Sequence, residues 1–366
     1  MSVAQFKCGS CGSTAPLETI NSLCGCGGLF RLDFTPQEFN PALVDKAEWN
    51  IFRYRAFMPP LGDGWRDITL GEGMTATTLY KKDLWFKLDY AMPTLSFKDR
   101  GAAALIWLCK SIRVKNVVQD SSGNAGNSVA AYCARAGIGC EIFVPKGTSV
   151  SKIRMIEAHG AVCVVYEGSR DETADACRKK ARDEGLYYAN HVYNPMFYQG
   201  TKTFIYEIYE QHGRIPDNLF IPAGNGTLLL GSQLALNELF AAALIAKLPH
   251  IFVVQSERCA PLFRAGAEPR SVTPEPTYAE GIAIAKPMRG QEILSPASYS
   301  GQRTFITAPE AGILPAREEL SRSGFHVEHT TAATYAAYLA YTSEHTLSGD
   351  CLIPLCGAGL KSDKQT

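Results

Sequence analysis

The stretch VKNVVQDSSGNAGNSVAAYCARAGIGCEIFV, residues 114–144, decides the fold. Its pattern predicts a short apolar strand over 114–119, a helix over 124–135 and a second apolar strand over 139–144. A strand, a helix and a strand in this order make a βαβ unit, whose two strands lie parallel in one sheet. We therefore expect an α/β protein built on parallel sheets.

The same alternation extends over the rest of the chain. It predicts further helices at 150–158, 171–184 and 331–346, strands at 161–166, 219–222, 251–255 and 351–355, and a long buried helix within 228–248. The segment 265–276 is rich in proline and charge, which is typical of a surface loop. A chain of 366 residues is long enough for two domains.

Composition and charge exclude several classes of partner. The 36 acidic and 36 basic residues balance, so no net field draws the protein to nucleic acid. The chain has neither a secretory signal pattern nor the roughly 18 consecutive apolar residues of a membrane span. Twelve cysteines without such a signal fit a reducing compartment. We expect a cytoplasmic protein that acts on a small molecule, with no nucleic-acid or membrane partner.

Four cysteines lie close together near the start of the chain, namely Cys8, Cys11, Cys24 and Cys26. Their C-x2-C and C-x-C spacing provides four thiolates, which suit a tetrahedral zinc ion. We expect a small zinc-ribbon-like knuckle over residues 1–35. The C-x-C half is tighter than the usual spacing. We therefore keep a second interpretation, in which the knuckle binds no metal and only caps the fold. Basic residues are few there, which disfavours a nucleic-acid-binding ribbon.

The segment PTLSFKDRG, residues 93–101, leads from a proline turn into an alanine-rich helix, with Lys98 at the junction. A lysine there lies near the unpaired N–H groups and the positive dipole end of the helix. Such a position favours the uncharged amine, as a lysine that forms a Schiff base requires. Taken alone, Lys98 is better explained as a surface lysine, and the Schiff-base interpretation depends on the motifs that follow it.

Two turns of small residues each follow a predicted strand and open a helix. The turn SSGNAGNS, residues 121–128, can hold a carboxylate on backbone N–H groups, or it can be a plain βα turn with capping side chains. The turn GNGT, residues 224–227, can hold a phosphate. Its glycines do not fit G-x-G-x-x-G, which disfavours a dinucleotide. Cys356, at the end of the last strand, indicates by itself only packing.

In this order, and with TLGEGMT at 69–75, QGTKT at 199–203 and AEGI at 279–282, the motifs make the family resemblance plain. The chain resembles the β-family, or fold type II, of pyridoxal-phosphate enzymes and within it the threonine-synthase-like proteins, over about residues 5–361. The resemblance implies two open twisted parallel-sheet domains with the cofactor in the cleft, and a homodimer. The domains it implies are a knuckle at 1–35, a large cofactor-binding domain at 36–110 with 200–366, and a smaller α/β domain at 111–199.

The resemblance also implies roles for particular residues. Lys98 would form the Schiff base, Asn124 would bond the phenolic oxygen, and Cys356 would lie near the pyridine nitrogen, where a neutral partner favours elimination and replacement over transamination. The further cofactor-binding residues would be Phe97, Gly224, Asn225, Gly226 and Thr227. The substrate carboxylate would bind the loop formed by Ser121, Ser122, Gly123, Asn124 and Ala125. The candidates for binding a substrate phosphate are Asn190, Arg154 and Lys202.

Two positions depart from the family pattern. Leu95 stands where the family commonly has glycine, which adds bulk near the cofactor. His329 stands where the family has proline, and it is either a titratable group or a structural side chain. The leading hypothesis is a lyase that removes phosphate from O-phosphohomoserine and adds water at the β-carbon. The alternatives are a serine or threonine dehydratase, a phosphoserine-using synthase, or a non-catalytic zinc-binding regulatory protein.

Overall fold

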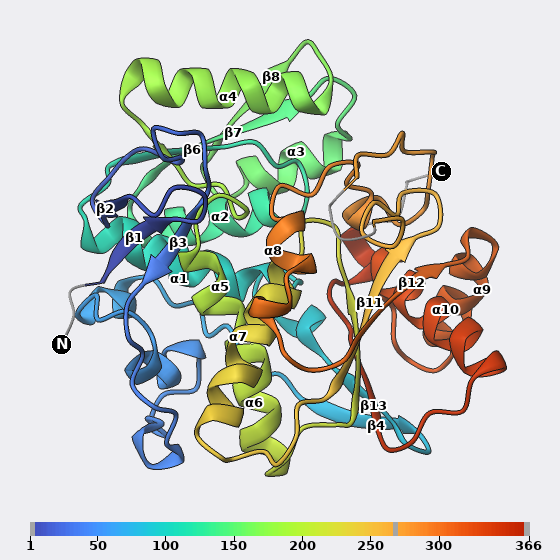
Figure 1. Ribbon diagram of the computed structural model, residues 1–366. Helices are drawn as coiled ribbons and strands as arrows, with labels where there is room; N and C mark the ends of the chain where they lie inside the picture. The colour runs from blue at the N-terminus through green and yellow to red at the C-terminus, as the bar shows by residue number, and fades with distance from the viewer. Residues whose placement is uncertain (1–3, 266–269, 362–366) are drawn as a thin grey trace. The chain divides into compact units, whose positions relative to one another are not determined.

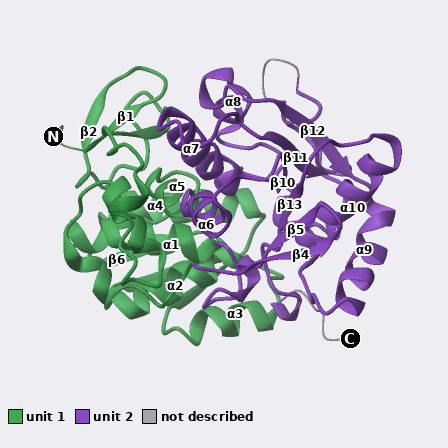
Figure 2. Ribbon diagram, turned by 90° about the horizontal axis from the view of Figure 1, so that it is seen from below, with its two compact units in different colours: residues 1–73, 98–201 green, residues 74–97, 202–366 purple. Residues whose placement is uncertain are grey.

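The computed structural model describes residues 4–265 and 270–361. The chain divides into two compact units, coloured separately in Figure 2. Unit 1 comprises residues 1–73 and 98–201, and unit 2 comprises residues 74–97 and 202–366. This division differs from the expected domains, because residues 36–73 and 98–110 belong to unit 1 with residues 111–199, whereas residues 74–97 lie with residues 202–366 as expected. Each unit therefore consists of two separate segments.

Unit 1 is built on a four-stranded parallel sheet with the strand order β8-β7-β6-β9. Its strands are β6 (Asn116–Gln119), β7 (Gly139–Pro145), β8 (Val162–Tyr166) and β9 (Tyr187–Tyr188). The connecting helices are α2 (Asn124–Ala136), α3 (Val150–Glu157) and α4 (Arg170–Glu184). The predicted βαβ units are confirmed, and the ends of their strands and helices lie within two residues of the predicted positions.

Apolar side chains cover both faces of this sheet. Ala130 of α2 and Ile156 of α3 pack with Ile142 on one face. Cys177 of α4 packs with Val118 on the other face. Figure 1 shows the same layers, with α4 on the opposite side of the strands from α2 and α3.

Helices α1 (Lys98–Ser111) and α5 (Met196–Thr201) of unit 1 pack against each other at glycine positions. A Cβ added at Gly101 would overlap the ring of Phe197, and one at Gly200 would overlap the carbonyl oxygen of Arg100. No side chain larger than hydrogen fits between the two helices at these points. The close approach brings Phe197 next to the first turn of α1.

The cysteine-rich start of the chain folds as part of unit 1. Strands β1 (Gln5–Cys8), β2 (Thr14–Pro16) and β3 (Phe30–Asp33) form an antiparallel sheet of order β2-β1-β3. Leu23 and Leu29 pack against the apolar cluster that contains Val118 and Tyr188. The 3₁₀ helices that follow are η1 (Pro41–Leu43), η2 (Ile51–Phe57) and η3 (Asp63–Asp67).

Unit 2 contains a six-stranded sheet of order β12-β11-β10-β13-β5-β4. The strands are β4 (Thr77–Lys81), β5 (Leu84–Lys87), β10 (Asn218–Pro222), β11 (His250–Ser256), β12 (Arg303–Ala308) and β13 (Cys351–Pro354). All neighbouring strands are parallel except β4 and β5, which form an antiparallel hairpin. The expected open parallel sheet is confirmed, with this hairpin as an addition.

Helices cover both faces of the sheet of unit 2, as Figure 1 shows. One face packs on α9 (Glu310–Arg322) and α10 (His329–Glu344), and α6 (Thr203–His212) and α7 (Thr227–Ala241) lie on the other. The short helices are η4 (Asp89–Ala91), η5 (Glu280–Ile282), α8 (Gly290–Leu294), η6 (Pro296–Ser298) and η7 (Gly359–Lys361).

One expectation changes in unit 2, and another agrees with the structure in the part of the chain that is described. Helix α7 ends at Ala241, before the apolar run does, because Ala243 takes a positive φ of 54°. Of the expected loop 265–276, residues 266–269 lie outside the described residues, and residues 270–276 have neither helix nor strand. Within the described parts of the chain, no helix is both long and apolar enough to cross a membrane.

Candidate active site

In unit 1, two loops leave neighbouring parallel strands at the same edge of the sheet. One follows β6 and leads through residues 120–123 into α2, and the other follows β9. The carboxylate of Asp120 joins them, because it accepts hydrogen bonds from the Tyr188 hydroxyl at 2.6 Å and from Nδ2 of Asn190 at 2.7 Å. This is the edge of an open α/β sheet at which ligands bind.

The loop after β6 has the shape of an anion-binding turn. A Cβ at Gly126 would overlap the carbonyl oxygen of Ser121, so the chain folds tightly back on the start of α2. Gly123 is the N-cap, and no side chain caps the helix. Ser121, Ser122 and Asn124 are half-buried. Since the first turn of a helix has N–H groups without intrahelical partners, the loop suits the carboxylate expected there.

Asn190 has all its side-chain hydrogen bonds within unit 1. Besides Asp120, its Nδ2 contacts the Tyr188 hydroxyl at 3.1 Å, and its Oδ1 accepts from the N–H groups of Val192 and Tyr193 at 2.8 and 3.2 Å. An asparagine side chain has two donors and two acceptor positions, and all four are used. We assign Asn190 to the support of the loop in place of the expected substrate contact.

Beside Lys98 lie two aromatic side chains that the sequence analysis did not select. The Lys98 Nζ atom is 5.6 Å from the centroid of the Phe197 ring, and the ring of His191 is 5.7 Å from the same centroid. Burial, with a contribution from the positive charge of Lys98, holds the pKa of His191 well below its ordinary value. The lowered pKa favours the neutral form of the His191 imidazole. No pattern in the sequence singled His191 out, because β9, which precedes it, was not among the predicted strands.

In unit 2, the turn 224–227 lies between β10 and α7. Gly226 has a positive φ of 75°, and a Cβ there would overlap Ile293. A Cβ at Gly224 would lie 2.8 Å from Cγ1 of Ile284, in the segment that follows the AEGI motif. Thr227 is buried as the first residue of α7, whose N-cap has no side-chain bond. The tight, glycine-dependent turn at a helix start suits a single phosphate.

The residues directly before Lys98 are held by the loop that follows β13. The Phe97 N–H donates to the Cys356 carbonyl at 2.9 Å, and the Ala358 N–H donates to the Leu95 carbonyl at 3.1 Å. Cys356 is itself buried, and its N–H donates to Oγ1 of Thr331 at 3.0 Å. The backbone on the N-terminal side of Lys98 is therefore anchored to the end of a central strand.

Leu95 takes the left-handed conformation, with a φ of 62°. This conformation costs a residue with a Cβ about 1–2 kcal/mol, which glycine avoids. The side chain is half-exposed. Leu95 thus keeps the backbone shape for which glycine is best suited, and it presents a branched side chain three residues before Lys98.

Three other side chains selected from the sequence have specific surroundings. Lys202 is fully buried, and its Nζ pairs with Glu238 at 3.1 Å, so the expected role in binding a substrate phosphate does not fit. Arg154 is exposed on α3. His329 begins α10 and stacks on Tyr278 with ring centroids 5.8 Å apart.

A buried ion pair of unit 2 holds the segment that precedes β4. Lys87 and Glu207 have no exposed side-chain surface, and Lys87 Nζ lies 2.9 Å from Glu207 Oε2. Glu207 also accepts the N–H of Met74 at 2.8 Å, and Lys87 donates to the carbonyl of Thr75 at 2.5 Å. Met74 has a positive φ of 49°, so the pair fixes a strained turn.

Glu72 is a buried carboxyl group of unit 1 in the TLGEGMT motif. It accepts hydrogen bonds from the Leu70 N–H at 2.9 Å and from the Tyr132 hydroxyl at 3.0 Å. Burial raises the pKa of Glu72 to about 7, and the negative charge of Asp99 adds to the effect. The carboxyl group joins the turn at 69–72 to α2.

The four cysteines of the knuckle converge on one point. Their Sγ atoms all lie within 4.8 Å of one another. The Cys8 and Cys26 sulfurs are 3.5 Å apart and those of Cys11 and Cys24 are 3.6 Å apart, far beyond a disulfide bond. Tetrahedral zinc with Zn–S bonds of about 2.3 Å would place its sulfurs about 3.8 Å apart. The arrangement fits a structural zinc ion.

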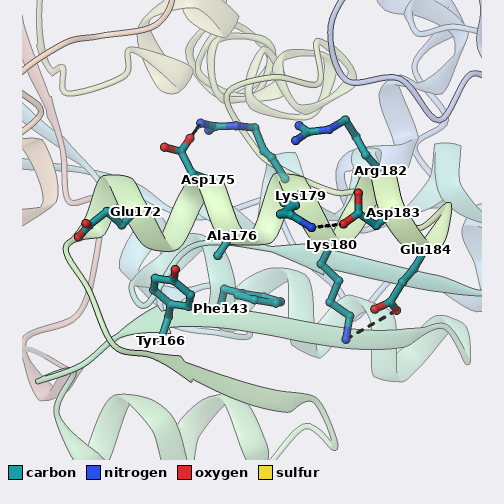
Figure 3. A pocket seen from close by; sticks show the side chains of 11 residues that line it. Phe143, Tyr166, Glu172, Asp175, Ala176, Lys179, Lys180, Arg182, Asp183 and Glu184 are labelled. Carbon is teal, nitrogen blue, oxygen red and sulfur yellow. Dashed lines mark hydrogen bonds and ion pairs between the residues drawn. The ribbon is translucent and has the colours of Figure 1, made fainter.

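A surface depression over α4 lies elsewhere in unit 1 (Figure 3). Phe143 and Tyr166 form its floor, and the charged residues of α4 form its rim. Several of the rim charges are paired, as in Lys179 with Asp183 and Lys180 with Glu141. The depression contains none of the residues expected in the active site.

Comparison with known proteins gives concordant matches. Residues 68–357 match the family model described as "Pyridoxal-phosphate dependent enzyme". The chain is 28% identical to threonine synthase of Methanocaldococcus jannaschii, over 97% of this chain and 92% of the relative. It is 33% identical to threonine synthase of Mycobacterium tuberculosis, over 76% and 79%. Threonine deaminase isoform 2 from Solanum lycopersicum has the same fold, with a TM-score of 0.68 at 21% identity, covering 89% and 94%.

Proposed function

Because the chain belongs to the family of pyridoxal-phosphate-dependent enzymes, we propose that it is a threonine-synthase-type lyase that carries its cofactor on Lys98. The likeness to a threonine synthase over 97% of the chain carries this proposal. The substrate would be O-phosphohomoserine, which loses phosphate from its γ-carbon and gains water at its β-carbon.

The bound cofactor would supply an electron sink for charge at the substrate α-carbon. The Lys98 amine would move protons at the α- and β-carbons, and Asn124 would donate to the phenolic oxygen. The loop formed by Ser121, Ser122, Gly123, Asn124 and Ala125 would hold the substrate carboxylate on its N–H groups. The phosphate would bind the turn Gly224, Asn225, Gly226 and Thr227, whose glycines leave room that a Cβ would fill. The neutral thiol of Cys356 would leave the pyridine nitrogen largely unprotonated.

A second candidate reaction is elimination or replacement at the β-carbon, as in a dehydratase of serine or threonine or a phosphoserine-using synthase. Two observations favour it. Leu95 adds bulk before Lys98, and the pairing of Lys202 with Glu238 removes one expected cation for a substrate phosphate. Incubation with O-phosphohomoserine, O-phosphoserine and L-threonine separates the reactions. Threonine with free phosphate supports the first candidate, and a keto acid supports the second.

The cofactor itself is tested by absorption spectra of the purified protein and of the variant Lys98→Ala. We expect a visible band of bound cofactor in the wild type, its loss in Lys98→Ala, and its retention in Lys115→Ala, which changes an exposed lysine of the same unit. A colourless wild type after addition of pyridoxal phosphate would contradict the proposal. It would favour the non-catalytic zinc-binding alternative.

We also propose that Cys8, Cys11, Cys24 and Cys26 hold one structural zinc ion. The convergence of the four sulfurs supports this site. Metal analysis should find one zinc per chain in the wild type and in Cys163→Ser, and none in the double variant Cys11→Ser/Cys24→Ser. A wild type that binds no zinc would support the ligand-free knuckle.

The proposal includes a homodimer and a cytoplasmic location, both of which the family resemblance and the cysteine content favour. Sedimentation equilibrium of the holoenzyme should give twice the chain mass of 39.9 kDa. A monomer mass would remove the dimer from the proposal and leave the chemistry untouched.

A further inference from the structure

His191 is a buried polar side chain with an unused hydrogen-bonding atom. It lies in the loop after β9, is 9% exposed, and its Nδ1 atom has no hydrogen-bond partner in the described part of the chain. A buried polar group without a partner destabilises the folded state, and a ligand that pairs with it removes that cost. Its neighbours in the loop differ, because Asn190 is fully bonded and Asn194 bonds the Tyr187 hydroxyl and the Met196 N–H.

The position of His191 relative to Lys98 is fixed by packing within unit 1. Both side chains contact the ring of Phe197, at 5.7 and 5.6 Å from its centroid. That ring is held where Gly101 and Gly200 let α1 and α5 approach each other. His191 and the amine that the proposed function places at the reacting carbons therefore share Phe197 as a neighbour, and the charge of Lys98 contributes to the lowered pKa of His191.

His191, Phe197 and Asn190 differ in the contacts that they can offer to a ligand. A neutral imidazole has one nitrogen that donates and one that accepts, so it can bond a hydroxyl or an ester oxygen. Phe197 offers only an apolar face, and the amide of Asn190 is already used. Of the three, only His191 can make a new hydrogen bond to a ligand.

We propose that His191 contacts the substrate directly, with Nδ1 hydrogen-bonded to the oxygen on the substrate side chain. It thereby selects amino acids that carry oxygen at the reacting side-chain carbon. This inference rests on the proposed function, since it takes the substrate to react at Lys98. It deepens that function by naming the group that is recognised.

The test is a binding cycle in the holoenzyme with ligands that differ by one oxygen. L-homoserine has a γ-hydroxyl, L-threonine has a β-hydroxyl, and L-2-aminobutyrate is the deoxy analogue of both. Affinities come from the change in the cofactor band on titration. In the wild type we expect one of the hydroxylated ligands to bind about 10- to 100-fold more tightly than L-2-aminobutyrate, since a lost bond to a buried group costs about 1–3 kcal/mol.

Two variants and a control complete the cycle. His191→Phe keeps a ring but removes Nδ1, so its affinities for the hydroxylated ligand and for L-2-aminobutyrate should become nearly equal. His191→Asn keeps a polar atom near the Nδ1 position and should retain most of the wild-type preference for the hydroxylated ligand. His159→Asn changes a half-buried histidine of the same unit and should leave the preference unchanged. The ¹⁵N signal of the His191 imidazole is identified as the one that is absent from the spectrum of His191→Asn. In the wild type, this signal should shift when the preferred hydroxylated ligand binds and should not shift when L-2-aminobutyrate binds.

The outcomes separate this inference from the proposed function. A normal cofactor band with an undiminished hydroxyl preference in His191→Phe would overturn the role of His191 and leave the proposed function standing. A wild type without a cofactor band would overturn both. A preference for L-threonine over L-homoserine would support His191 and favour the β-carbon reaction.

Discussion

The buried pair of Lys87 and Glu207 makes a quantitative prediction about unit 2. The substitution Glu207→Gln keeps the size of the side chain but removes the charge 2.9 Å from Lys87 Nζ. Because neither side chain is exposed, water does not replace the lost partner. Loss of one member of a buried pair costs about 3–5 kcal/mol, a large part of the 5–15 kcal/mol that stabilises a typical domain.

The size of the effect separates charge from packing. The double variant Lys87→Met/Glu207→Leu removes both charges together, which is neutral or stabilising by about 1–4 kcal/mol in well-packed cases. Here the Met74 N–H also loses its acceptor, which costs about 1–3 kcal/mol. We therefore expect the free energy of unfolding of the double variant to be close to that of the wild type and clearly higher than that of Glu207→Gln.

Urea denaturation of the wild type and these variants measures the free energies of unfolding. The control is Glu318→Gln, which breaks an exposed pair with Arg322 in the same unit and should cost less than about 1 kcal/mol. If Glu207→Gln costs no more than Glu318→Gln, the reasoning about the buried charge is refuted.

Three further predictions concern unit packing, pH and backbone strain. Gly200→Ala should destabilise the protein in urea by about 2 kcal/mol, because a Cβ that overlaps a backbone carbonyl calls for the upper end of the roughly 3 kcal/mol cost of overpacking, and helix propensity returns about 1 kcal/mol. Unchanged stability would contradict the close approach of α1 and α5. Glu72 has a folded pKa of about 7, above the 4.5 of an unfolded glutamate, so it binds its proton more tightly when folded and its stabilising contribution is lost as pH rises from 4.5 through 7. Urea titrations should show the wild type losing stability relative to Glu72→Gln across that range, and a constant difference would argue against the buried carboxyl. At position 95, the melting temperature of Leu95→Gly should exceed that of Leu95→Ala by an amount equivalent to about 1 kcal/mol. The reason is that alanine keeps the cost of a Cβ in the left-handed conformation, which glycine avoids. Equal melting temperatures would argue against strain at this position.

Local patterns in the sequence predicted much of unit 1. The strand, turn and helix signals around residues 114–144 are short-range, and β6, α2 and β7 form where they indicate. The same holds for α1 after the proline turn, and for the cysteines, whose spacing already implied convergence. In each case the information lies within one turn or one helix of the residue concerned.

What the sequence did not reveal depends on partners far along the chain. The hairpin of β4 and β5 was not predicted, and its place in the sheet depends on the distant β13, which pairs with β5 so that Leu84 lies opposite Cys351. Lys202 was a candidate for phosphate binding until Glu238 on α7 supplied its partner. His191 was overlooked because its proximity to Lys98 comes from the packing of α1 on α5. Charge pairing and side-chain proximity of this kind are set by tertiary structure.

The interleaving of the two units also bears on the order in which the protein can fold during synthesis. Unit 1 has all its segments once residue 201 has been made, so its parallel sheet can form early. Residues 74–97 of unit 2 are made before most of unit 1, but β5 obtains its central neighbour only when β13 leaves the ribosome. Until then the edge of β5 that pairs with β13 stays open, in a hairpin that lies between two segments already able to fold. A ribosome that stalls before Cys351 would therefore leave a folded unit 1 attached to an aggregation-prone hairpin.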